Sequence, residues 1–333
     1  MEYRPLGSTG TKVSQLCFGT WRFGRPTGGV IETGRDEAHE LLDTAWEHGI
    51  NFIDTANVYG DHDGTSERWI GEWLADHDRE DFVIASKVYF DMGDGPNDDG
   101  LGRKHVRAQI EGTLDRLGTD YLDIYYIHRW DEETPIEETL ATLDDLVRDG
   151  KVHYLGASTM AAWQLTKALW KSDVNGWESF EVTQPLFHAA YRDDVADYLD
   201  VCADQGLAVC PYSPLAGGFL TGKYEREGDE IVGPEGSRAD VDSRFEEYYV
   251  SRRGWHVLDA IRAVADELDA TPAQVALRWL IEQDRFETIP IVGARTPEQI
   301  EENVGAVDIS LSDDQFDRID AARYAEDGRR HGH

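Results

Sequence analysis

Short apolar segments alternate with longer amphipathic segments along almost the whole chain. A short apolar segment between turn residues is typical of a buried strand, whereas apolar residues at every third or fourth position mark the inner face of a helix. Ala38, Leu41, Leu42 and Ala45 show the second pattern. The alternation predicts an α/β protein in which strands and helices follow one another in turn.

Eight strands can be placed in this way, each followed by at least one helix. The predicted strands comprise residues 16–21, 51–54, 82–87, 121–128, 152–156, 180–184, 207–211 and 288–292. The predicted helices comprise residues 36–48, 66–74, 104–117, 135–148, 160–170, 194–205, 255–268, 272–282, 297–304 and 313–323. Because parallel neighbours need a crossover connection, this order predicts a parallel (β/α)8 TIM barrel. An open, doubly wound sheet is the competing architecture.

The length of 333 residues exceeds that of an ordinary domain but suits a barrel, which takes about 250 residues before insertions. We expect one barrel domain over residues 1–333, with two domains as the alternative. Residues 1–13 form an N-terminal segment in this scheme, residues 224–253 form a lid or flexible loop over the site, and residues 325–333 form a disordered tail. A second polar loop, residues 91–101, is also expected to overhang the site.

Polar side chains stand where three successive predicted strands end. Asp54 closes one strand, with Tyr59 in the turn behind it, and Lys87 and His128 close the next two. Because the carboxyl ends of the strands of a parallel barrel share one face, we expect these four side chains to converge. Each alone has an ordinary alternative, as a capping acid, a half-buried ring or a surface charge. Together they indicate a catalytic site.

The chemistry of this set is that of proton donation to a carbonyl oxygen. A tyrosine, with a pKa of about 10, is a poor acid unless a cation stabilises its phenolate, and Lys87 is the candidate cation. Asp54 supplies the counter-charge that keeps a desolvated ammonium protonated. His128 can donate a hydrogen bond to the same oxygen. A hydride is the natural partner of such a proton.

Over essentially its whole length the chain resembles the aldo-keto reductase family. It is most similar to the branch that includes bacterial general-stress reductases and the beta subunits of voltage-gated potassium channels. The resemblance is carried by residues 49–56, 59–60, 66–67, 85–87, 121–128, 212–218 and 293–299. That family folds as a (β/α)8 barrel and reduces aldehydes and ketones with NADPH. The resemblance therefore implies a carbonyl substrate and a catalytic tetrad of Asp54, Tyr59, Lys87 and His128.

The resemblance also implies a set of cofactor contacts. Tyr212 would stack on the nicotinamide, Ser158 and Gln184 would bond its carboxamide, and Lys223 would offer charge to the pyrophosphate. The other residues that we expect at the cofactor are Gly19, Thr20, Trp21, Ser213, Leu215, Gly217, Arg295, Gln299, Glu302 and Asn303.

The coenzyme preference rests on the last predicted strand-to-helix connection. Thr296 is the expected N-cap and Pro297 the first helical residue, so free N–H groups would face an anion. Arg295 beside them suits a 2′-phosphate, which favours NADPH. Many NADP-selective members have a basic residue where Gln299 stands, so NADH remains an alternative coenzyme.

Three aromatic residues follow strands one, three and four, namely Trp21, Tyr89 and Trp130. Residues just beyond the strands of a barrel face its active site, so these rings are candidates for lining the substrate pocket. Packing of these rings against their neighbours, without contact to a substrate, is an equal alternative. The sequence does not fix which small carbonyl compound binds.

The composition narrows the partners. With 66 acidic and 32 basic residues, the net charge is -34, which argues against binding nucleic acid by charge neutralisation. Only seven basic residues are lysines, and such a surface suits a halophilic protein, because concentrated salt screens its self-repulsion. An ordinary acidic enzyme is the alternative. Three widely spaced cysteines, no long apolar segment and no signal-peptide core indicate a cytoplasmic protein without a disulfide framework or a metal site.

Two other classes of function stay open. One is a regulatory subunit that senses nicotinamide nucleotides with little turnover, as the likeness to channel subunits suggests. The other is a metal-dependent barrel hydrolase that uses Asp54 and His128. The oligomeric state is undetermined.

The acidic composition generates a prediction about salt. We expect the protein to keep its activity and fold in molar potassium or sodium chloride and to lose both in dilute buffer, because self-repulsion is then unscreened. Activity and circular dichroism measured from dilute buffer to molar salt test this. Best activity in dilute buffer would contradict the halophilic interpretation.

Overall fold

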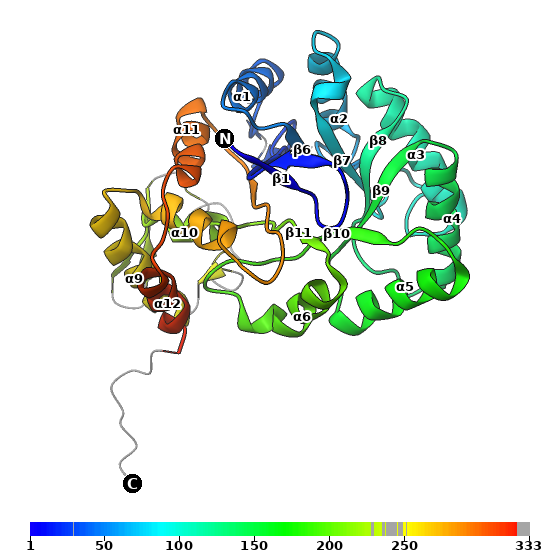
Figure 1. Ribbon diagram of the computed structural model, residues 1–333. Coiled ribbons are helices and arrows are strands. Elements are labelled where there is room, and N and C mark those ends of the chain that lie inside the picture. Colours follow the sequence, from blue (N-terminus) through cyan, green and yellow to red (C-terminus); the bar gives the residue numbers. More distant parts are fainter. Residues whose placement is uncertain are drawn as a thin grey trace.

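A ring of parallel strands forms the centre of the computed structural model, which describes residues 1–28, 30–227, 230–234, 237, 245, 249–250 and 252–324 (Figure 1). Along the sheet the strand order is β11, β10, β9, β8, β7, β6, β3 and β14. These strands are β3 (Cys17–Gly19), β6 (Phe52–Asp54), β7 (Val83–Val88), β8 (Leu122–Ile127), β9 (Val152–Ser158), β10 (Phe180–Gln184), β11 (Ala208–Val209) and β14 (Ile291–Val292). The order confirms the parallel (β/α)8 barrel and excludes the doubly wound sheet.

The two ends of the sheet meet through backbone hydrogen bonds. The Val209 N–H donates to the Glu287 carbonyl at 2.8 Å, and the Ile289 N–H donates back to the Val209 carbonyl at 2.9 Å. Two residues further along both segments, the Ile291 N–H donates to the Pro211 carbonyl at 3.0 Å. These bonds bring the last strand beside the seventh, and since the last strand also pairs with the first, they close the barrel.

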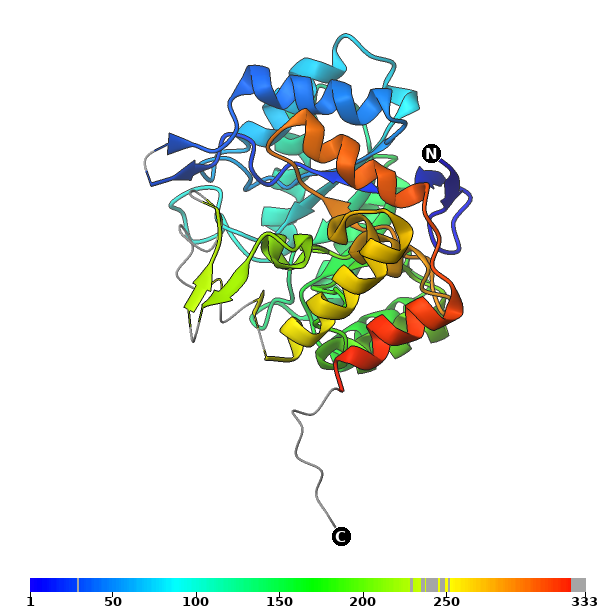
Figure 2. The ribbon, with the colours of Figure 1, turned by 90° about the vertical axis from the view of Figure 1, so that its left-hand side faces the viewer.

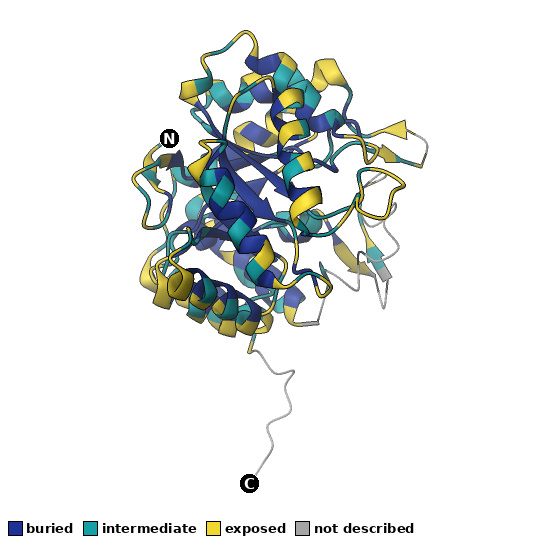
Figure 3. Cartoon of the chain, turned by 90° about the vertical axis from the view of Figure 1, so that its right-hand side faces the viewer, coloured by how far each residue is buried: buried dark blue, intermediate teal, exposed yellow. Residues whose placement is uncertain are grey.

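Helices surround the strands, with their buried faces turned inward and their exposed faces outward (Figure 3). They are α1 (Arg35–Glu47), α2 (Thr65–Leu74), α3 (Arg103–Leu117), α4 (Ile136–Arg148), α5 (Ala162–Asn175), α6 (Ala196–Gln205), α9 (Arg252–Leu268), α10 (Pro272–Ile281), α11 (Pro297–Val304) and α12 (Asp313–Ala322). Short 3-10 turns comprise residues Arg79–Asp81, Asp193–Val195, Ala216–Thr221 and Gly305–Val307. Among the described helices none combines the length and apolar character that a membrane span needs.

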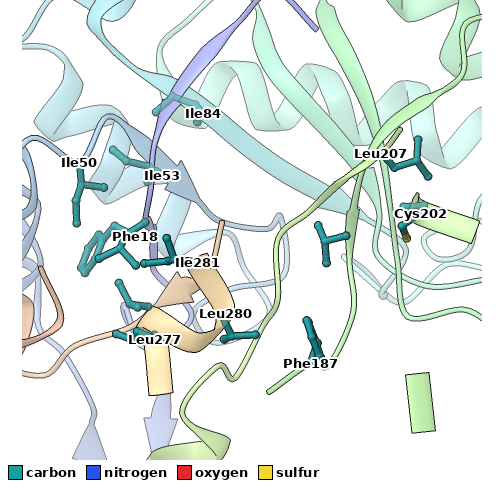
Figure 4. Packing of buried hydrophobic residues seen from close by; sticks show 14 of the residues in the cluster. Phe18, Ile50, Ile53, Ile84, Phe187, Cys202, Leu207, Leu277, Leu280 and Ile281 are labelled. Atoms are coloured by element: carbon teal, nitrogen blue, oxygen red, sulfur yellow. The ribbon is translucent and has the colours of Figure 1, made fainter. Parts of the chain in front are cut away.

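Side chains alternate between two apolar cores, as the period of a strand requires. In β8, Ile124 and Tyr126 belong to the core inside the barrel, whereas Tyr125 and Ile127 belong to the core under the helices. The hairpin of β1 (Tyr3–Pro5) and β2 (Lys12–Ser14) adds apolar side chains to the inner core. Figure 4 shows part of the outer core, in which strand residues such as Phe18 pack with residues of α10.

Strands seven and eight are shorter than predicted. Residues 207–211 and 288–292 were expected, but the structure has only Ala208–Val209 and Ile291–Val292. Pro211 and Pro290 explain the difference, because proline has no N–H to donate to a ladder. Their carbonyls still accept bonds, from Ile291 and Cys17 respectively.

Helix α5 extends beyond the predicted residues 160–170. It ends at Asn175, where Gly176 adopts a left-handed conformation with a φ of 65° and forms the C-cap. Glycine reaches this conformation without steric cost, so it is a common helix stop.

Two hairpins lie on the side of the barrel opposite the N-terminus (Figure 2). They are β4 (Pro26–Thr27) with β5 (Val30–Ile31), and β12 (Glu225–Glu227) with β13 (Glu230–Val232). The second hairpin belongs to residues 224–253, for which we predicted a lid or flexible loop. Much of that segment, and the predicted tail 325–333, lie outside the described residues.

Candidate active site

Every strand of the barrel presents a residue of interest at or just beyond its carboxyl end. In chain order these residues are Gly19, Asp54, Lys87, His128, Ser158, Gln184, Tyr212 and Gly293. The parallel arrangement brings them to one face of the barrel, because all the crossover helices return the chain to the opposite face.

The ammonium of Lys87 is completely buried and uses all three of its N–H groups. It donates to Asp54 Oδ1 at 2.6 Å, to the Thr55 carbonyl at 2.7 Å and to the Tyr59 hydroxyl at 3.2 Å. Burial alone would lower the pKa of Lys87, but the attraction of Asp54 and Tyr59 outweighs it and raises the pKa. Lys87 is therefore a cation fixed between a carboxylate and a phenol.

The carboxylate of Asp54 is held from two sides. Lys87 occupies Oδ1, and Gln184 Nε2 donates to Oδ2 at 2.8 Å. Gln184 was predicted only as a contact of the nicotinamide carboxamide, so its bond to Asp54 is a feature that the sequence did not indicate. The bond uses one of its two amide hydrogens and leaves its carbonyl oxygen for a ligand.

The phenol of Tyr59 faces the cavity and keeps its proton. Burial raises its pKa above the ordinary value, and the opposing attraction of Lys87 is the smaller effect. Lys87 does lower the pKa of Tyr59, which is the direction expected from the sequence. Burial has the larger effect, so the net shift of this pKa is upward. Tyr59 is consequently a phenol, not a phenolate, at neutral pH.

The His128 ring stands edge-on to Tyr59, with the ring centroids 6.0 Å apart. Its Nδ1 is buried, and no described residue bonds to it. Burial, Lys87 and Arg129 hold the pKa of His128 well below its usual value, so the imidazole is neutral. A neutral ring beside the phenol can share a hydrogen bond without adding a second charge.

A cavity of about 930 Å³ opens over these residues. Of the residues expected at the site, those that line it are Gly19, Trp21, Asp54, Tyr59, His128, Ser158, Gln184, Tyr212, Ser213, Leu215, Gly217, Lys223, Arg295, Gln299, Glu302 and Asn303. Lys87 lies behind Asp54 and Tyr59 and does not reach the surface. The face of the barrel thus gathers nearly the whole predicted set.

One wall of the cavity is a tight loop after β11. Ser213, Ala216, Gly217 and Gly218 all have positive φ, which turns the backbone sharply around the cavity. A Cβ at Gly218 would meet Lys223 Nζ at 3.0 Å, so glycine leaves room for that amine.

At the far end of the cavity, Thr296 is the N-cap of α11 and Pro297 its first residue, as predicted. The Gln299 side chain accepts a bond from the Arg295 N–H at 2.8 Å, which fixes it against the helix terminus. Burial, Arg295 and Arg22 lower the pKa of Lys223. The loop and the helix terminus together place two cations where an anionic ligand can reach them.

Besides Lys87, three predicted residues do not line the cavity. Thr20 is buried, and its N–H and hydroxyl both donate to the Asp54 carbonyl at 3.0 Å, so it secures the end of β6. Trp130 packs against Trp163, with the ring centroids 5.9 Å apart. Tyr89 contacts its neighbour Phe90, and it is Phe90 that lines the cavity.

Sequence reasoning missed several lining residues, chiefly Arg22, Arg25, Phe90, Arg129 and Tyr249. Phe90 and Arg129 each follow a strand end, which was the available signal. Tyr249 comes from the predicted lid 224–253, and its hydroxyl lies 3.3 Å from Ser213 Oγ. Residues 91–101, also expected to overhang the site, contribute nothing to the lining.

The buried ion pair generates a prediction about stability. Asp54→Ala should lower the free energy of unfolding by about 3–5 kcal/mol, because it leaves a buried ammonium without its counter-charge. The stabilisation that the raised pKa of Lys87 reflects is lost as the pH rises from the ordinary lysine pKa of 10.5 through the raised value, so it is fully present at neutral pH. Urea unfolding at neutral pH measures the change.

The double variant Asp54→Ala with Lys87→Met provides the control. It should be more stable than Asp54→Ala alone, since it removes the uncompensated charge. A double variant that is no more stable than the single one would show that the charge is not what Asp54 balances.

Comparison with known proteins finds relatives that match this chain over most of its length. A relative from Bacillus subtilis, an uncharacterised oxidoreductase named YrpG, is 37% identical over 93% of this chain and 92% of its own length. Norsolorinic acid reductase B of Aspergillus parasiticus is 36% identical over 99% of this chain and 86% of its own. A protein of Arabidopsis thaliana named as a probable voltage-gated potassium channel subunit beta is 35% identical over 93% of this chain and 92% of its own.

The match to the family extends over the barrel from its first strand to its last helix. The model of the Aldo/keto reductase family aligns with residues 15–323. That range includes every strand of the barrel and all the residues around the Lys87 ammonium. The chain therefore belongs to the aldo/keto reductase family of oxidoreductases, which generally use nicotinamide cofactors.

Proposed function

We propose that this protein reduces aldehydes or ketones to alcohols, with Tyr59 as the proton donor. The observation that carries the proposal is the bonding of one buried ammonium, that of Lys87, to both Asp54 and Tyr59 beside the cavity. Tyr59 gives its proton to the carbonyl oxygen, and Lys87 stabilises the phenolate that forms. His128, neutral and beside the phenol, orients the same oxygen by a hydrogen bond.

The residues around the cavity fit a nicotinamide dinucleotide. Tyr212 offers an aromatic face, Ser158 a hydroxyl and Gln184 an amide. Lys223 and Arg295 offer positive charge. A bound NADPH would supply the hydride. The residues at the strand ends and in the loop after β11 would hold the coenzyme, and Arg295 beside the N-terminus of α11 would bind the 2′-phosphate, which favours NADPH over NADH.

Two relatives named as probable channel subunits, from Arabidopsis thaliana and Oryza sativa, favour a second candidate function. In that case the barrel binds the nucleotide mainly to regulate a partner. Turnover discriminates between the two: a regulatory subunit binds NADPH but consumes it very slowly with every carbonyl compound, whereas a reductase sustains turnover with at least one.

Tyr59→Phe tests the proton donor. The substitution removes one hydroxyl, so NADPH binding should change less than about twofold while kcat falls roughly 100-fold or more, the usual scale for a general acid. Absorbance of NADPH during turnover and its fluorescence on binding give the two quantities.

Tyr121→Phe is the matched control, because the Tyr121 hydroxyl bonds to Glu80 at 2.8 Å and does not line the cavity. Its kcat should equal that of the unaltered protein. Unaltered turnover in Tyr59→Phe would remove Tyr59 from the mechanism.

Arg295→Ala tests the coenzyme. A charge-assisted bond to the 2′-phosphate is lost, so the Kd for NADPH should rise about tenfold or more. The Kd for NADH should change much less, because NADH has no such phosphate. Fluorescence titrations with both coenzymes measure the ratio. An equal loss for both coenzymes would show that Arg295 does not read the 2′-phosphate.

A further inference from the structure

The cavity is lined by positive charge although the chain is strongly acidic. Acidic residues outnumber basic ones by 66 to 32 in the sequence. Among the described residues that line the cavity the balance is reversed, since the cations are Arg22, Arg25, Arg129, Lys223 and Arg295 and the carboxylates are only Asp54 and Glu302. A cavity wall with this charge attracts anions.

Most of these cations already have a role or a partner. Lys223 and Arg295 are assigned to the phosphates of the coenzyme under the proposed function. Arg22 and Arg25 both pair with Glu32, the latter at 3.2 Å. The coenzyme and these ion pairs leave Arg129 unexplained.

Arg129 has no carboxylate partner among the described residues. Many other arginines of this acid-rich chain are held by carboxylates, as Arg79 is by Asp123 at 2.6 Å and Arg116 by Glu67 at 2.7 Å. Arg129 instead lies against the face of Tyr89, with the guanidinium carbon 5.5 Å from the ring centroid. An aromatic face positions a guanidinium without neutralising it.

The surroundings of Arg129 place it near the reacting centre. It directly follows His128 in the chain, lines the same cavity and is exposed there to solvent. The Phe90 ring contacts both Tyr89, on which Arg129 lies, and His128, with ring centroids 5.3 Å and 4.9 Å apart. A ligand that reaches His128 can therefore contact the aromatic ring of Phe90 and the N–H donors of Arg129 in the same cavity.

We propose that Arg129 is a specificity-determining residue that binds the carboxylate of an anionic carbonyl substrate. The proposal rests on the proposed reductase function and adds the class of substrate to it. The substrate is an aldehyde or ketone whose carboxylate stands away from the carbonyl, so that Tyr59 and His128 meet the carbonyl oxygen while the guanidinium meets the carboxylate. The planar fork of arginine suits a carboxylate better than a lysine ammonium does.

A matched pair of substrates tests this. 4-Carboxybenzaldehyde and methyl 4-formylbenzoate have the same ring and carbonyl and differ in a charge. The quantity measured is the ratio of kcat/KM for 4-carboxybenzaldehyde to kcat/KM for the ester, with NADPH and at one fixed salt concentration. This ratio should exceed one in the unaltered protein. In Arg129→Met the ratio should fall tenfold or more, and in Arg129→Lys it should fall less.

Arg285→Met is the control variant. Arg285 is exposed, pairs with Asp200 at 2.8 Å and does not line the cavity, so the ratio should stay the same. The absence of a carboxylate preference in the unaltered protein, or equal losses for both aldehydes in Arg129→Met, would overturn the proposal.

A binding measurement separates this proposal from the proposed function. If the protein reduces neither aldehyde, the reductase function fails for them, and calorimetry with 4-(hydroxymethyl)benzoate and its methyl ester still tests the anion site. Tighter binding of the benzoate that disappears in Arg129→Met supports the site. Equal binding of acid and ester overturns it.

Discussion

A single buried ammonium organises the active face of this barrel. Lys87 would be costly to bury as an isolated charge, by several kcal/mol, so its three N–H groups must all find acceptors in the native state. Asp54, Thr55 and Tyr59 supply them, and Asp54 is in turn held by Gln184. Since these residues come from β6, β7, β10 and the loop after β6, the charge is compensated only when the barrel is folded. The same requirement that stabilises the fold thus positions the phenol.

Burial has two opposite consequences at this site. It raises the pKa of Tyr59 and lowers that of His128, because each ring is harder to charge away from water. Lys87 remains the only charged member that pairs with the phenol, so its field acts on Tyr59 without competition from an imidazolium. The face of the barrel therefore holds one proton-bearing phenol, one neutral imidazole and one balanced ion pair, which is a suitable arrangement for giving a proton to a neutral carbonyl compound.

The charge of the whole molecule and the charge of the cavity lining have different effects. The net charge of -34 acts over the whole molecule, and salt screens it. The cations around the cavity act at short range on particular ligand groups, and some, such as Arg22 with Glu32, also tie the β4–β5 segment to the cavity wall. The total charge alone argues against anionic ligands, although the charged residues that line this cavity, among the described ones, are mainly cations.

The sequence by itself determined the order of strands and helices, the strand ends and the four polar residues there, because these follow from local periodicity and turn chemistry. It also predicted the N-cap at Thr296. Only the tertiary structure decided that Phe90 and not Tyr89 lines the cavity, that Thr20 secures Asp54, and that Gln184 reaches across the barrel to the same carboxylate. The reason is that side-chain direction at a strand end, and contacts between strands 130 residues apart, are set by barrel closure and packing, which no local pattern encodes.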